Sequence, residues 1–211
     1  MSEISNAVPT PPKLNAEEQQ NPSPATPERV TYVVVDGENI DATLGMSVLG
    51  RRPQPEERPR WDRITAYAKE LWEQPVRGLF FLNASNGQMP MSFVQALLAM
   101  GYTPIPLSGE SHEKVVDIGI QRTLEVLNQR EGDVLLASHD GDFLPQMSRL
   151  LSPGRKVGML CFREFVNAQF SELEEEGLQF FDLEREVGAF TTMLPRIKII
   201  PLEDFDPAKY L

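Results

Sequence analysis

Strand-like and helix-like runs alternate along the middle of the chain, and this alternation narrows the choice of fold more than any other feature. Short apolar runs typical of strands cover residues 30–35, 76–84, 102–107, 133–138, 156–162 and 178–183. Between them, helices are predicted at residues 61–74, 92–100, 114–129, 142–151 and 164–176. Strands that alternate with helices predict a three-layer α/β fold, in which a parallel sheet carries helices on both faces.

The two ends of the chain differ from this middle part. Residues 1–29 carry many prolines among Ser, Asn, Gln and Glu and almost no large apolar side chains, so we expect a disordered tail. The domain itself is expected to span residues 30–187, with a surface insertion rich in Pro and Arg at 50–60. Residues 188–211 are expected to form a C-terminal extension. Within it, RIKII (196–200) is either an edge strand or a partner-binding segment.

Composition limits the class of protein. The 211-residue chain has a formal net charge of −11, which argues against non-specific coating of nucleic acid, because such binding needs many Lys and Arg at phosphates. An enzyme that holds nucleic acid through a local basic surface and metal ions stays compatible with this charge. Cys161 is the only cysteine, which indicates a reducing compartment. The sequence has no signal-peptide pattern and no run long enough to span a bilayer, so we expect a soluble cytoplasmic protein without a membrane partner.

Acidic side chains follow the predicted strands at their carboxyl ends. Asp36 comes directly after the apolar run 33–35, and Asn39 stands three residues later. Asp140 and Asp142 form the turn after the run 135–137, and Asp117 lies in the first turn of the helix predicted at 114–129. In an open parallel sheet, these positions lie at the edge where ligands bind.

Each of these residues taken singly has a structural role open to it, because an Asp after a strand is usually a turn or helix-cap residue. Taken together they place several like charges in one crevice, where repulsion raises pKa values unless a divalent cation is bound. We therefore expect Mg²⁺ or Mn²⁺ as cofactor, a combination suited to phosphodiester hydrolysis. The expected metal ligands are Asp36, Asp117, Asp140 and Asp142.

Three blocks of the sequence resemble the motifs of NYN domains, a group within the PIN-like nucleases, and more narrowly those of their LabA-like branch. The blocks are VVVDGENI (33–40), KVVDIGI (114–120) and LLASHDGDFLPQM (135–147), and the resemblance covers roughly residues 30–182. It implies a PIN-like (Rossmannoid) fold and a metal-dependent endoribonuclease that acts on RNA. It also implies the catalytic residues Asp36, Asn39, Asp117, Asp140 and Asp142.

Three positions depart from the pattern of that family. Members often carry a second Asp six residues after the middle one, where this chain has Thr123, and this puts a second metal site and full activity in question. The usual Gly before the Asp of the third block is His139, which we expect at the rim of the site without a chemical role. The usual Ser between the two Asp residues of that block is Gly141.

Basic residues near these blocks are candidates for binding the RNA backbone. Arg51 and Arg52 belong to the insertion at 50–60, the most concentrated basic stretch, and Lys114 and Arg122 flank the middle block. Their positive charge would offset the acidic balance of the chain where phosphates approach. The preference for RNA over DNA rests on the resemblance alone.

Two classes of function stay open at this point. One is a metal-dependent ribonuclease. The other is a catalytically weak RNA-binding or regulatory module that keeps the fold, and Thr123 and the acidic balance favour it. A phosphotransferase with Asp36 as nucleophile ranks lower, because Glu38 stands where such enzymes need a second Asp. By analogy with PIN-like proteins we expect a homodimer, and we expect a protein partner at the N-terminal tail or the C-terminal extension.

Overall fold

Six strands form one parallel sheet, which confirms the predicted α/β architecture. The computed structural model describes residues 29–110, 112–195, 202–209 and 211. Neighbouring strands are all parallel, and the order across the sheet is β3-β2-β1-β4-β5-β6. The strands are β1 Thr31–Asp36, β2 Val76–Asn83, β3 Tyr102–Leu107, β4 Asp133–Ala137, β5 Val157–Cys161 and β6 Leu178–Asp182.

The strand order reverses direction between β1 and β4. From β1 the chain proceeds outward through β2 to β3, then crosses back to β4 and proceeds the other way to β6. Connections therefore leave the carboxyl ends of β1 and β4 in opposite directions and open a crevice between them. Asp36 ends β1, and Ser138 follows the last residue of β4. The acidic turns singled out in the sequence thus lie at the topological switch point.

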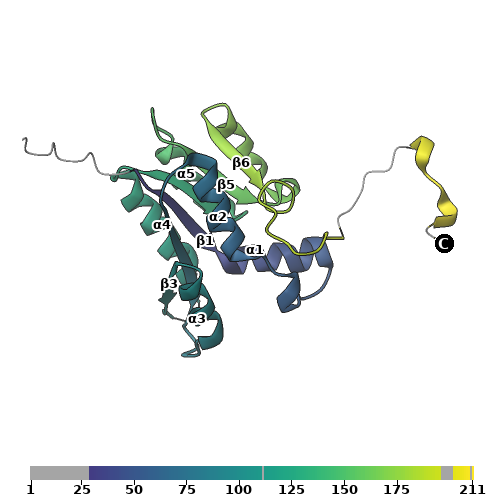
Figure 1. Ribbon diagram of the computed structural model, residues 1–211, viewed down its shortest axis with the longest axis horizontal. Helices are drawn as coiled ribbons and strands as arrows, with labels where there is room; N and C mark the ends of the chain where they lie inside the picture. Colours follow the sequence, from purple (N-terminus) through teal and green to yellow (C-terminus); the bar gives the residue numbers. More distant parts are fainter. Residues whose placement is uncertain (1–28, 111, 196–201, 210) are drawn as a thin grey trace, which may run out of the picture.

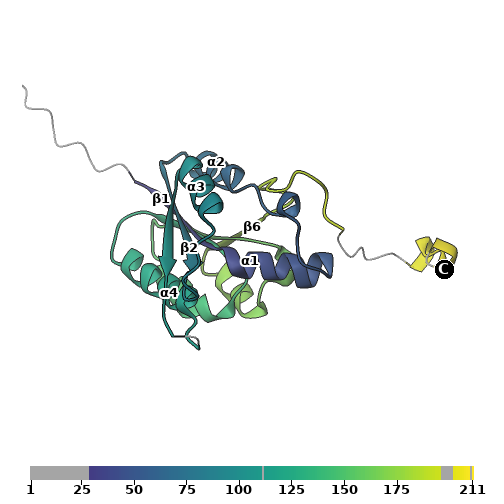
Figure 2. The same ribbon diagram turned by 90° about the horizontal axis from the view of Figure 1, so that it is seen from below.

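Helices cover both faces of the sheet, so the fold has three layers (Figures 1 and 2). On one face, α2 (Trp61–Trp72) packs over alternate residues of β1 such as Val33 and Val35, and α3 (Met91–Ala99) packs beside β3. On the other face, α4 (Val115–Asn128) and α5 (Leu144–Leu150) pack over Val34. This division follows from the two-residue period of a strand, which sends successive side chains to opposite faces.

A helix begins directly after β1, where the sequence predicts a turn and then an insertion. Asp36 caps α1 (Gly37–Thr43), and the chain continues as a π-helix, η1 (Leu44–Leu49). Gly37 is required at this junction, because a Cβ there would lie 2.5 Å from the ring atom Cζ of Phe80. The prediction missed this helix because α1 is short and the whole segment is bracketed by glycines, which weaken a helical pattern. Only the loop that follows, with the 3₁₀ turn η2 (Pro55–Glu57), matches the expected insertion.

The helix predicted at 164–176 is wrong in type. The structure has two 3₁₀ segments there, η4 (Arg163–Phe165) and η5 (Ala168–Glu174). The side chain of Asn167 accepts a hydrogen bond from the backbone N–H of Gln169, so this residue starts a new turn instead of continuing a helix. The helix predicted at 142–151 likewise begins as a 3₁₀ turn, η3 (Gly141–Phe143), before α5.

Both ends of the described domain are tied to the core. Arg29, placed in the tail by the sequence, donates two hydrogen bonds to the fully buried carboxylate of Asp133, at 3.1 and 2.6 Å. At the other end, Arg63 donates to the carbonyl oxygens of Gly188 and Phe190, so the extension expected from residue 188 starts with a packed segment. The RIKII segment lies outside the described residues. Among those described, no helix is both long enough and apolar enough to cross a bilayer.

Candidate metal centre

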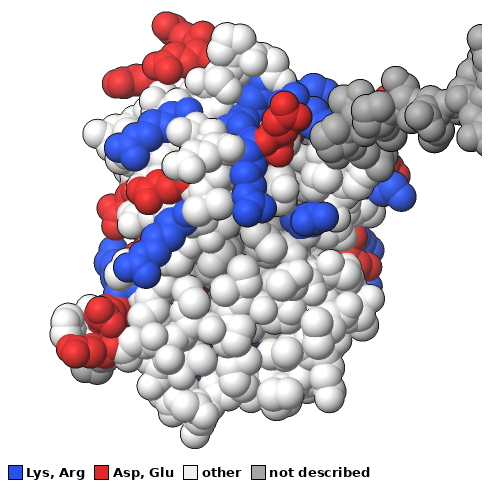
Figure 3. All heavy atoms as spheres, turned by 90° about the vertical axis from the view of Figure 1, so that its left-hand side faces the viewer, with Lys and Arg blue, Asp and Glu red and all other residues white. Residues whose placement is uncertain are grey.

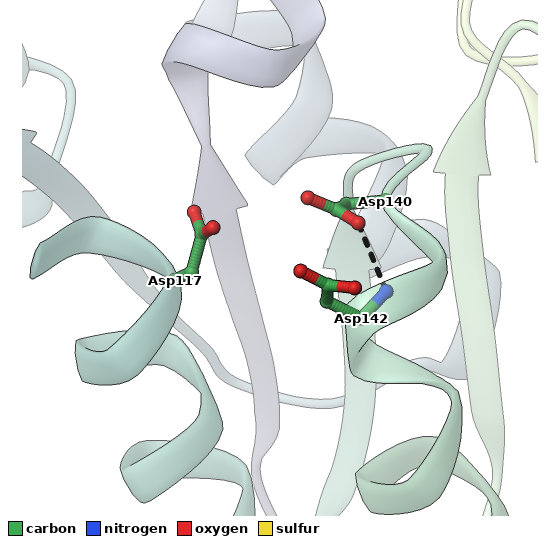
Figure 4. A group of neighbouring side chains, drawn as sticks. All are labelled: Asp117, Asp140 and Asp142. Atoms are coloured by element: carbon green, nitrogen blue, oxygen red, sulfur yellow. Dashed lines mark hydrogen bonds between the residues drawn. The ribbon is translucent and has the colours of Figure 1, made fainter. Parts of the chain in front are cut away.

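Three aspartates converge at the crevice between β1 and β4. Asp117 projects from the first turn of α4, whereas Asp140 and Asp142 come from the turn between β4 and α5. One carboxylate oxygen of each lies within 4.8 Å of the others, and Figure 4 shows the three side chains facing one space. Asp117 and Asp140 are half-buried and Asp142 is exposed, so the group is open to solvent on one side. This spacing leaves room for a small cation between the oxygens.

Short-range hydrogen bonds fix the turn that carries two of these aspartates. The backbone N–H of Asp142 donates to Oδ1 of Asp140 at 2.9 Å, and Ser138 Oγ accepts from the backbone N–H of Asp140 at 3.2 Å. Gln121, one helical turn after Asp117, donates to the backbone oxygen of Asp142 at 3.2 Å and ties α4 to the turn. The sequence analysis did not identify Gln121, because its spacing of four residues from Asp117 is the only sequence feature that links it to the site.

The turn also accounts for the glycine at position 141. A Cβ on Gly141 would lie 2.4 Å from the Nδ2 atom of Asn167. The Asn167 side chain therefore occupies the space that a serine side chain would need in this chain. The departure from the family pattern at this position reflects local packing beside the acidic group.

A lysine provides a cation at the group in the described structure. Lys114 Nζ lies 3.0 Å from Oδ2 of Asp142 and 3.3 Å from Oδ2 of Asp117. Hydrogen bonds to Asp142 and Asp117 raise the pKa of Lys114 above its ordinary value. The group thus already accommodates a positive charge, and its hard oxygen donors match the ligands that Mg²⁺ and Mn²⁺ prefer. Lys114, expected at an RNA backbone, is engaged by the carboxylates instead.

Asp36 lies behind this group rather than within it. Its side chain is only 2% exposed and accepts hydrogen bonds from the backbone N–H of Asn39 at 3.2 Å and from Ser138 Oγ at 3.0 Å. Burial raises the pKa of Asp36 to about 6; the two hydrogen bonds oppose the shift, and the charges of Asp117 and Asp140 add to it. The charge of Asp36 therefore interacts with those of Asp117 and Asp140, but Asp36 is not part of the group whose oxygens lie within 4.8 Å of one another.

Asn39 and His139 form hydrogen bonds that stabilise the turn after β4. Oδ1 of Asn39 accepts a hydrogen bond from the backbone N–H of His139 at 2.8 Å and lies 3.1 Å from its Nδ1. Nε2 of His139 accepts from the backbone N–H of Phe162 at 2.8 Å, so the proton of the neutral ring is assigned to Nδ1. Burial lowers the pKa of His139 to about 4. His139 is thus a buried link between α1, β4 and β5, and the expected rim position is wrong.

Thr123 stands far from the acidic group. Six residues of α-helix separate it from Asp117 by about 9 Å along the axis. Its hydroxyl donates to the backbone oxygen of Gly119 at 2.8 Å, and it lines a hollow with Val76 and Thr103, at the amino-terminal ends of β2 and β3. A carboxylate at position 123 would not reach the three aspartates. The departure at this position therefore removes no ligand from the group.

Most arginines of the basic stretch are already paired. Arg51 donates to both carboxylate oxygens of Glu57, at 2.7 and 2.6 Å. Arg58 pairs with Asp41, and Arg60 with Asp62. The side chains of Arg52 and Arg122 are exposed, and within the described part of the chain no ion pair involves them. Of the arginines proposed to bind RNA, these two therefore offer the more accessible charge.

A cavity of about 570 Å³ opens beside the first residues of α1. Gly37 and Glu38 at the start of α1 form one wall. Trp61 and Phe93 contribute aromatic rings, with Phe80 between them at centroid distances of 4.9 and 5.4 Å. Since Gly37 directly follows Asp36, the last residue of β1, this aromatic cavity also lies at the carboxyl edge of the sheet.

Comparison with known proteins agrees with this architecture. A Vibrio parahaemolyticus protein of unknown function has a crystal structure that superposes with a TM-score of 0.58 at 17% identity, covering 75% of this chain and 95% of that one. At that identity the likeness shows the fold. No curated protein matches the chain significantly. The sequence profile of the NYN domain matches residues 30–184, which include all three aspartates. The chain therefore belongs to the NYN domain family, and its sheet and flanking helices are consistent with a PIN-like fold.

Proposed function

We propose that the protein is a metal-dependent endoribonuclease that hydrolyses RNA phosphodiester bonds. The observation that carries the proposal is the group formed by Asp117, Asp140 and Asp142, whose oxygens lie within 4.8 Å of one another at the switch point of the sheet. NYN domains are generally nucleases, which supports this chemistry for the group. The finer placement in the LabA-like branch rests on the three sequence blocks at 33–40, 114–120 and 135–147.

In this proposal the three aspartates hold Mg²⁺ or Mn²⁺. When bound, the ion supplies Lewis-acid chemistry and screens the charge of the phosphate. Asp36 acts as a positioning residue, because its carboxylate holds Ser138, which in turn holds the backbone of Asp140. Asn39 positions the same turn through its contacts with His139. The site thus consists of an open acidic group supported by a buried polar layer.

The aromatic cavity favours a nucleic acid over a small phosphate ester. Its volume lies in the range of small-ligand pockets, and the half-buried ring of Phe93 on its wall suits the stacking of a nucleobase. Arg52 and Arg122, both exposed, are the proposed contacts to the backbone.

Incubation of end-labelled single-stranded RNA with the full chain tests the proposal. We expect internal cleavage in Mn²⁺ or Mg²⁺ and none in EDTA. Retained RNA binding without cleavage in any divalent metal would instead support the catalytically weak RNA-binding module. The absence of both RNA binding and RNA cleavage would contradict both functions.

Lys114 is expected to compete with the metal. Lys114→Met keeps most of the side-chain volume but removes the charge that now bridges Asp117 and Asp142. Because the lysine is largely exposed, the competing interaction is weak, and we expect Mn²⁺ to bind about three- to tenfold tighter in the variant. Isothermal titration calorimetry with Mn²⁺ measures this change in Kd. Lys69→Met, in the last turn of α2, is the control and should leave Mn²⁺ affinity unchanged.

We also propose a cytoplasmic location and a protein partner. The single cysteine fits the proposed cytoplasmic location. A protein partner at the N-terminal tail would involve residues 1–28, which lie outside the described part of the chain.

A further inference from the structure

One part of the chain is free of charge. No Asp, Glu, Lys, Arg or His occurs between Arg77 and Glu110, although 24% of all residues are Asp, Glu, Lys or Arg. This stretch contains nearly all of β2, the whole of α3 and the whole of β3. Because β3 is an edge strand and α3 lies beside it, the stretch forms one outer side of the molecule. The proposed nuclease function uses this stretch only where Phe80 and Phe93 line the aromatic cavity.

Figure 3 shows the consequence at the surface. The view preserves the height of each element in Figure 1, where α3 and β3 lie at the bottom, and the lower part of the space-filling surface carries almost no blue or red atoms. Charged side chains gather in the upper part of the same view. We call this charge-free surface, formed by α3 and β3, the neutral face.

Apolar side chains are exposed on the neutral face. Met91 is 57% exposed and Leu98 is 59% exposed. They stand seven residues apart on α3, which places them on the same side of the helix. Exposed apolar side chains grouped on one surface, in a region without charge, are typical of a protein contact.

The edge strand limits how a partner can bind there. β3 carries Pro104 and Pro106, and proline has no N–H to donate to a further strand. Extension of the sheet across this edge is therefore disfavoured. A partner must bind through side chains, of which Met91 and Leu98 on α3 are the most exposed apolar ones.

We propose that the neutral face binds a second copy of this chain in a two-fold symmetric dimer. In such an interface the same patch meets itself, so a charge close to the two-fold axis would face its own copy. Two chains that each carry a net charge of −11 repel one another, and the neutral face is the surface where this repulsion is weakest. The absence of charge and the exposed apolar side chains thus both fit self-association.

Light scattering coupled to gel filtration tests the dimer. The full chain is expected at twice the 23.8 kDa of one copy. Met91→Asp and Leu98→Asp each place two like charges at the interface and should raise the dimer Kd by about a hundredfold. Met46→Asp, at a 77% exposed methionine of η1 away from the neutral face, introduces the same charge and should leave the dimer intact.

The salt dependence distinguishes this apolar dimer from one held by ion pairs. Raising the salt concentration screens the repulsion between the two negative chains and should tighten the dimer, whereas an interface held by ion pairs would weaken. Circular dichroism of each variant checks that it stays folded. A wild-type chain that stays at 23.8 kDa at every concentration would overturn the proposal. So would a dimer that survives both Met91→Asp and Leu98→Asp.

Discussion

Asp117→Asn is expected to reduce metal-dependent RNA cleavage by about a hundred- to a thousandfold. Asparagine has nearly the same shape as aspartate, so the fold is kept while one charged oxygen of the three-aspartate group is lost. Asp140 also caps the turn, because its carboxylate accepts from the backbone N–H of Asp142. Replacement of Asp117 leaves that cap in place and therefore tests the chemistry of the group more directly than a change in the turn.

Asp62→Asn provides the matched control for this prediction. Asp62 also lies in the first turn of a helix, α2, and also pairs with a basic residue, Arg60. The two substitutions thus remove the same charge from the first turn of a helix, one at the crevice and one away from it. Equal cleavage by Asp117→Asn and wild type, measured from initial rates in Mn²⁺, would show that the three-aspartate group is not the catalytic site.

Asp36→Asn is expected to stabilise the fold at pH 8 by about 2–3 kcal/mol while lowering activity. Burial raises the pKa of Asp36 from 3.8 to about 6. A carboxylate with a raised folded-state pKa favours the folded state when protonated, so its contribution to stability is full below about pH 4 and is lost as the pH rises through about 6. Asparagine carries no charge; its amide oxygen can replace Oδ1, which accepts from the N–H of Asn39, and its amide nitrogen can donate to the hydroxyl oxygen of Ser138 in place of Oδ2. Urea unfolding measures the free energy of unfolding at each pH. Between about pH 4 and pH 8, this free energy should therefore decline less with rising pH in the variant than in wild type.

Asp133→Asn serves as the control, and we expect it to change the stability of the fold in the opposite direction. Burial alone would raise the pKa of Asp133, but hydrogen bonds from Arg29, the backbone of Lys156 and Gln74 outweigh it, and the pKa is lowered. This carboxylate contributes stability above its unfolded pKa and loses it as the pH falls through the folded pKa. Asp133→Asn should therefore destabilise the fold at about pH 8. If both variants shift stability in the same direction, the assigned environment of Asp36 is wrong.

The sequence predicts the sheet well because strands and helices alternate with clear periods. Each apolar run became a strand, and parallel pairing then placed the carboxyl ends of β1 and β4 side by side. This pairing alone brings the turn at 138–142 to the same edge as Asp36. It does not determine which carboxylates share one space, because that depends on side-chain directions. Asp36 points into the protein and Asp117 points into the crevice.

Contacts between distant residues account for what the sequence did not reveal. His139 stands next to an acidic residue in sequence, yet it is buried by Phe162 and held by Asn39. Thr123 matches a family position by spacing, yet nearly two helical turns carry it away from the acidic group. Lys114 lies three residues from Asp117, but its contact with Asp142 arises only when α4 packs against the turn.

Anomalous scattering from a crystal soaked in Mn²⁺ tests the central claim most directly. The account predicts a manganese peak between Asp117, Asp140 and Asp142, at about 2.2 Å from their oxygens, with the amino group of Lys114 displaced. Lys114 still bridging Asp117 and Asp142, with manganese bound elsewhere or not at all, would contradict it.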